Sequence, residues 1–161
     1  MPQFRRRPLL AGLAAALAAP GLAAAQGAEL KFGALFPFSG GLALLGDESF
    51  RGLEVASEER NAAGGVLGRQ IRLAKGDAVD QAQAISEVRR LMTAERVVAV
   101  FGTYASPLSF AATQVSELQG VPYFEMGAIS DPITERGFRY VFRTCPRSSD
   151  FGVATVAAVP D

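Results

Sequence analysis

The chain has 161 residues, of which 49% are hydrophobic and 20% charged, and its formal net charge at pH 7 is zero. This composition is typical of one globular domain, and the lack of net positive charge argues against a nucleic-acid partner. The chain contains no histidine and one cysteine, Cys145. These counts exclude Ser/His and Cys/His nucleophile pairs, histidine-ligated zinc and an intrachain disulfide. We therefore expect a protein that is not an enzyme and uses neither a metal nor another cofactor.

Residues 1–25 have the three parts of an export signal. Residues 5–7 are arginines, residues 9–19 are almost all apolar, and residues 23–25 are alanines suited to a cleavage site. The apolar segment is short for a membrane span. We expect export to the periplasm with cleavage near Ala25, and both the Sec and the twin-arginine routes stay open.

Strands and helices are expected to alternate along the rest of the chain. Strands are expected at residues 30–36, from residue 71, at 97–101, 121–125 and 140–142, with helices at 47–61, from 80, at 106–118 and from 150. Asp47, Asp80 and Asp150 are each expected to cap the helix that follows. Because the connections are short, the pattern predicts an α/β fold, a doubly wound parallel sheet with helices on both faces.

The most informative stretch joins the central strand to the third helix. Val97–Phe101 is a run of five apolar residues, which favours a strand buried on both faces. Ser106 is a good N-cap and Pro107 a good first helical residue. The amide groups at that helix end suit a carboxylate or another anion. On local sequence alone, a purely capping role for Ser106 stays open beside a ligand-binding role.

Three loops follow the carboxyl ends of expected strands, namely residues 37–46, 102–105 and 126–132. In doubly wound sheets, ligands bind at this edge, where the strand order reverses. We therefore expect the binding site among these loops. Glu125 stands at the start of the third loop, and two interpretations stay open: it supplies a negative charge for a ligand amine, or it is a solvated strand-end glutamate.

Other motifs have simpler explanations. Gly64, Gly65 and Gly68 follow a helix instead of a strand, so they indicate a turn and not a nucleotide-binding loop. Asp77 and Asp80 lack further metal ligands at suitable spacing, and capping and loop solvation explain them.

An ordered set of segments runs through the chain after the export signal: residues 38–40, 46–47, 61–69, 102–107, 133–137 and 140–144. Together they resemble the periplasmic substrate-binding proteins of branched-chain amino acid type ABC transporters. The resemblance implies two α/β lobes that close over a ligand like a hinged trap. Residues 26–148 correspond to the N-terminal lobe, and residues 149–161 to the start of the crossover into a missing second lobe.

The resemblance implies a receptor that binds an amino acid or related small carboxylate and delivers it to a membrane permease. A ligand-sensing regulator of the same fold and a non-functional truncated fragment stay open as alternatives. Ser106 matches the carboxylate-binding serine of the family, and Tyr104 and Ala105 lie beside it in the same loop. Gly127 and Ala128 match the stretch whose backbone contacts the polar end of the ligand.

Two positions depart from the amino-acid binders of this family. Ile129 stands where these proteins usually have a threonine that contacts the ligand α-ammonium group, and Leu45 stands where they often have a tyrosine. Because isoleucine offers no acceptor, an α-ammonium group would lose a partner there. The sequence therefore favours an organic or aromatic acid without that group.

Overall fold

The structure is a computed structural model that describes residues 28–159. The expected export signal lies outside these residues. A five-stranded sheet of order β2-β1-β3-β4-β5 organises the chain, and every strand pair is parallel. The strands are β1 (Leu30–Phe36), β2 (Ile71–Asp77), β3 (Val100–Gly102), β4 (Tyr123–Glu125) and β5 (Val141–Arg143). The predicted α/β class and doubly wound parallel sheet are confirmed.

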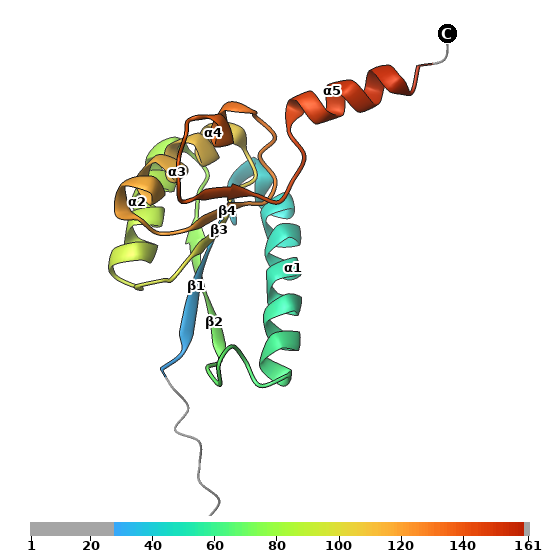
Figure 1. The fold of residues 1–161 in the computed structure, drawn as a ribbon. Helices are drawn as coiled ribbons and strands as arrows, with labels where there is room; N and C mark the ends of the chain where they lie inside the picture. The colour runs from blue at the N-terminus through green and yellow to red at the C-terminus, as the bar shows by residue number, and fades with distance from the viewer. Residues whose placement is uncertain (1–27, 160–161) are drawn as a thin grey trace, which may run out of the picture.

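Helices cover both faces of the sheet (Figure 1). They are α1 (Ala43–Ala62), α2 (Gln81–Thr93), α3 (Ser106–Gln119), α4 (Pro132–Glu135) and α5 (Ser148–Ala157), with a 3-10 turn η1 (Gly40–Leu42) before α1. α1 lies against β1 and β2, and α2 and α3 pack together on the opposite face. α5 is exposed along its length and projects away from the sheet. Within residues 28–159, no helix combines the length and apolar character needed to cross a membrane.

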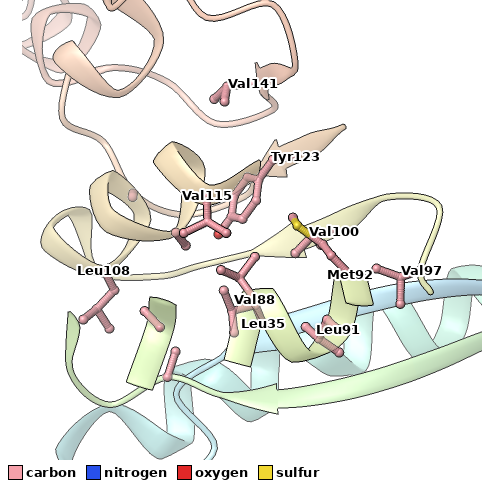
Figure 2. Close-up of a cluster of buried hydrophobic side chains, with 14 of the residues drawn as sticks. Leu35, Val88, Leu91, Met92, Val97, Val100, Leu108, Val115, Tyr123 and Val141 are labelled. Atoms are coloured by element: carbon pink, nitrogen blue, oxygen red, sulfur yellow. The ribbon is translucent and has the colours of Figure 1, made fainter. Parts of the chain in front are cut away.

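The main hydrophobic core lies between the sheet and the α2–α3 layer (Figure 2). Leu35 and Val100 enter it from the sheet, Val88 and Leu91 from α2, and all four are fully buried. Burying a side chain of this size stabilises the fold by about 2 kcal/mol. This core therefore fixes where α2 and α3 lie, and it holds the start of α3 at the end of β3.

The opposite face of β3, β4 and β5 carries a row of stacked rings. The Phe101 and Phe124 ring centroids are 5.1 Å apart, and those of Phe124 and Phe142 are 5.3 Å apart. Phe142 is 46% exposed, and Phe101 in the central strand is only half-buried. The expectation that the central strand is buried on both faces is therefore wrong, because α1 covers β1 and β2 and leaves this part of the face partly open.

The three expected aspartate caps have different outcomes. Asp80 caps α2 as predicted, since its Oδ1 accepts the Gln83 N–H over 2.8 Å. The prediction for Asp47 is wrong, because η1 starts the helical path earlier and places Asp47 inside α1. Asp150 is not the N-cap of α5 either. It occupies the third helical position and accepts the N–H of the N-cap Arg147 over 2.8 Å.

Candidate functional site

The strand order reverses between β1 and β3, since the chain leaves β1 for β2 on one side and returns to β3 on the other. The loops after β1, β3 and β4 emerge at the same edge of the parallel sheet, as predicted (Figure 1). This edge is closely packed at Gly102, where a Cβ atom would collide with the carbonyl oxygen of Leu35 and φ is +148°. Glycine is therefore required where the second loop leaves the sheet.

Ser106 is the first residue of α3 and not its N-cap, so the capping prediction is wrong. Ala105 is the N-cap, and its carbonyl oxygen accepts the N–H groups of Leu108 and Ser109, each over 3.0 Å. The helix thus begins one residue earlier than a serine cap would require. The Ser106 Oγ accepts the Ser130 N–H over 3.3 Å from the β4–α4 loop. The hydroxyl therefore faces the neighbouring loop instead of its own helix.

Tyr104 and Gly127 also meet across the two loops. A Cβ atom at Gly127 would lie 3.1 Å from Tyr104 Cδ2 and 3.4 Å from the Thr103 carbonyl oxygen. Tyr104, Ser106 and Gly127 are each half-buried. The structure thus brings together the second and third predicted loops, with these candidate residues at their junction.

The backbone of Gly127 and Ala128 is held by the protein itself. Their N–H groups donate to Glu125 Oε1 over 3.0 and 2.8 Å. Ala128 is 1% exposed, and its carbonyl oxygen accepts from Arg143 Nη1 over 2.5 Å. In this structure the N–H groups of these two candidates are therefore committed to an internal acceptor.

Leu45 and Ile129, the two departures from the amino-acid binders, are exposed at this edge. Leu45 lies in the first turn of α1, directly after the loop that follows β1, and is 37% exposed. Ile129 is 42% exposed, and its carbonyl oxygen accepts the Ser148 N–H over 2.7 Å. Both residues thus present apolar side chains to solvent in segments that follow the carboxyl ends of strands.

Glu125 is fully buried at the end of β4, so both interpretations of it from the sequence are wrong. Its Oε2 accepts the Thr103 N–H over 3.3 Å and the Ser109 hydroxyl, and its Oε1 accepts from Gly127 and Ala128. Burial raises the pKa of Glu125 above its ordinary value, and the four donors oppose that rise. The sequence did contain one signal: Ser109, Thr113 and Ser116 recur on the buried face of α3 and indicate polar partners beneath it.

The comparison with known families covers nearly all of the described chain. The family model of periplasmic binding proteins matches residues 29–160. The chain belongs to the periplasmic binding protein family. The resemblance seen in the sequence is thereby confirmed, and the five-stranded parallel sheet agrees with one lobe of such a protein.

Individual relatives agree with this assignment. The "Leu/Ile/Val-binding protein homolog 7" of Brucella suis biovar 1 (strain 1330) is 59% identical over 129 residues, which are 80% of this chain and 32% of the relative. The isoleucine complex of LivJ from Streptococcus pneumoniae superposes with a TM-score of 0.72 at 34% identity, covering 75% of this chain and 35% of LivJ.

A solute-binding protein from R. palustris in complex with benzoate also superposes with a TM-score of 0.72, at 31% identity over 79% of this chain and 35% of its own. The periplasmic binding chain described here thus spans about a third of the length of the relatives that it matches. Within residues 28–159, no group of three or more Asp, Glu and Cys side chains is placed to hold a metal ion.

Proposed function

We propose that this chain is the ligand-binding lobe of an extracytoplasmic solute-binding protein. The protein serves an ABC importer, binds a small carboxylate and delivers it to a membrane permease without a catalytic step. Support comes from the family match over residues 29–160 and from relatives described as binding proteins for solutes of this size. Residues 26–148 form the lobe, and α5 leads into a second lobe.

The observation that carries the proposal is the position of the Ser106 hydroxyl. It is half-buried at the start of α3, beside the point where the strand order reverses. A carboxylate at this position accepts the Ser106 O–H and lies at the positive end of the helix dipole. Tyr104 and Ala105 form the adjoining loop, and Gly127 borders it from the other side.

The ligand class that fits this edge is an organic or aromatic acid without an α-ammonium group. Ile129 provides no side-chain acceptor for such a group, and Leu45 adds apolar surface at the same edge. Glu125 does not replace the missing acceptor, because its carboxylate is fully buried and already accepts four hydrogen bonds. The benzoate complex of one relative shows that the family fold accommodates an aromatic acid.

Transport requires that the ligand be enclosed and then released. Sites of this kind lie between domains, so each lobe supplies part of the contacts. Closure of a second lobe over a ligand held at the Ser106 edge would be driven by contacts that exist in the closed state alone.

The proposal is tested by a ¹⁵N NMR titration of the exported chain with benzoate and with isoleucine. We expect benzoate to shift the amide signals of Tyr104, Ser106 and Ile129 with a dissociation constant well above micromolar, and to bind more tightly than isoleucine. Shifts that map to the amino ends of the strands, around Lys31 and Arg96, would overturn the proposal. So would the absence of any shift at the Ser106 edge at millimolar benzoate.

A further inference from the structure

We propose that Glu125 is a positioning residue of the binding site. Its buried carboxylate fixes the position of residues 103–106, which lead into α3, relative to the loop of residues 127–129. The importance of this arrangement for ligand binding rests on the function proposed above. The joining of the two loops is a property of the chain itself and is measurable without a ligand.

The two carboxylate oxygens serve different loops. Oε2 accepts the Thr103 N–H over 3.3 Å and the Ser109 hydroxyl, both from the segment that begins α3. Oε1 accepts the N–H groups of Gly127 and Ala128 over 3.0 and 2.8 Å, both from the loop after β4. One side chain therefore joins the two loops that border the proposed ligand position.

The chemistry of this cluster requires a group that accepts from several donors at once. Three of the four partners are peptide N–H groups, which can donate and cannot accept. A carboxylate offers acceptor positions on both oxygens, whereas a glutamine amide would turn its own N–H groups toward a peptide donor on one side. No ion pair involves Glu125 within residues 28–159. The four neutral donors alone hold the carboxylate.

The other contacts around these loops do not replace Glu125. Ser130 N–H to Ser106 Oγ, at 3.3 Å, is a single neutral hydrogen bond at the rim. Arg143 holds the carbonyl oxygen of Ser130 over 2.6 Å, but it reaches that loop from β5 and not from the α3 side. The buried hydroxyl groups of Thr103 and Tyr123 have no hydrogen-bond partner in the described part of the chain. The carboxylate is therefore the main polar link between the loops.

Burying a carboxylate that forms no ion pair lowers the free energy of unfolding, and this cost favours a role in positioning the loops. Burial raises the pKa of Glu125 above its ordinary value in spite of the four donors. An apolar residue of similar volume would avoid the desolvation cost, but it would leave three peptide N–H groups without an acceptor. The buried carboxylate therefore lowers the stability of the fold but holds the two loops in a fixed geometry.

The test is amide hydrogen exchange, followed by NMR, on the full exported chain and three variants. Glu125→Gln changes the acceptor, Ser109→Ala removes one donor, and Ser116→Ala is the matched control. Ser116 lies two turns further along the same face of α3 and is equally buried, but its hydroxyl donates to the carbonyl oxygen of Val121. The same samples are then titrated with benzoate.

We expect Glu125→Gln to accelerate exchange of the Thr103, Gly127 and Ala128 amides by about tenfold and to weaken benzoate binding by about tenfold. Ser109→Ala should accelerate exchange at Thr103. If Glu125→Gln does not fold, the Ser109 variant decides whether the Glu125 cluster positions the two loops. Ser116→Ala should leave all of these amides and the benzoate affinity unchanged.

Unchanged exchange at Thr103 and Gly127 in the Glu125 and Ser109 variants would overturn the positioning role. Equal acceleration in Ser116→Ala would also overturn it, because the effect would then reflect general loosening of α3. If the unaltered chain binds no benzoate, the proposed function fails, while the exchange data still decide the role of Glu125.

Discussion

The Ser130 N–H donates to the Ser106 Oγ over 3.3 Å and joins residues that are 24 positions apart in the chain. A hydroxyl group has one proton to donate and two lone pairs that accept. When Ser106 accepts from Ser130, its own O–H therefore remains available for a ligand carboxylate. The contact orients the serine and leaves its donor free.

Ser106→Ala should weaken benzoate binding by about tenfold, because the charged ligand carboxylate loses the hydrogen bond that the Ser106 hydroxyl donates. The dissociation constant is measured by NMR titration of residues 26–161. Ser86→Ala serves as a control, since its hydroxyl donates to the Gln83 carbonyl oxygen on α2. Equal affinity in the Ser106 variant and the unaltered chain would remove Ser106 from the site.

Ile129→Thr should improve isoleucine binding several-fold and leave benzoate binding nearly unchanged. The new hydroxyl gives an α-ammonium group an acceptor at the exposed edge, whereas benzoate has no such group to satisfy. Ile129→Val is the matched control, because it has nearly the same shape as threonine and no acceptor. A gain for isoleucine in both variants would show that side-chain size, and not the hydroxyl, controls the preference.

Asp77→Ala should lower the free energy of unfolding by about 2 kcal/mol. Asp77, at the end of β2, accepts the Phe38 N–H over 2.8 Å and the Ser39 hydroxyl over 2.5 Å, and so fixes the loop after β1. Urea unfolding measures the change. Asp47→Ala, an exposed aspartate of α1, should cost much less; similar losses in both variants would contradict the assignment.

Stability should depend on pH through Glu125, whose pKa in the folded protein is raised above the ordinary 4.5 by burial. Between these two pKa values, the folded state holds a proton that the unfolded state has released. The contribution of Glu125 to stability is therefore complete below pH 4.5 and is lost as the pH rises through the raised pKa.

The measurement is urea unfolding of the unaltered chain and of Glu125→Gln, from about pH 4 to about pH 8. Subtracting the two curves removes groups common to both proteins, such as Asp131 and Asp150, whose lowered pKa values act in the opposite direction at more acidic pH. The unfolding free energy of the unaltered chain minus that of Glu125→Gln should decline as the pH rises. A constant or increasing difference would show that the folded pKa is not raised.

Calorimetric titration of the chain with benzoate should give a dissociation constant well above micromolar. An open edge contributes part of a site that normally lies between two domains, so a lone lobe forms only some of the contacts. Submicromolar binding by residues 26–161 would contradict the view that a second lobe completes the site.

The elements that the sequence predicts best are those whose local signals agree. β1 runs from Leu30 to Phe36 as expected, and Asp80 caps α2, because an apolar run and an N-cap are local features. The expected Ser106 cap is wrong because serine is strongly preferred over alanine at N-caps, whereas α3 has Ala105 as its N-cap and no side-chain cap hydrogen bond.

Features that depend on distant segments were not predictable in the same way. The partners of Glu125 come from the loop after β3, from α3 and from the loop after β4, and no spacing along the chain brings Thr103 and Gly127 to one carboxylate. The exposure of Phe142 likewise depends on which helices cover which strands. Topology alone predicts that the loops after β1, β3 and β4 emerge at one edge of the sheet, where the candidate site is proposed, but it does not predict the hydrogen bonds within that site.

The most direct test of the proposed site is a crystal structure of residues 26–161, from crystals grown at saturating benzoate. We predict that the benzoate carboxylate lies within hydrogen-bond distance, about 2.7 Å, of Ser106 Oγ, with the ring against Ile129 and Leu45. A carboxylate bound instead beside Lys31 and Arg96, which line a pocket at the amino end of β1, would contradict the account.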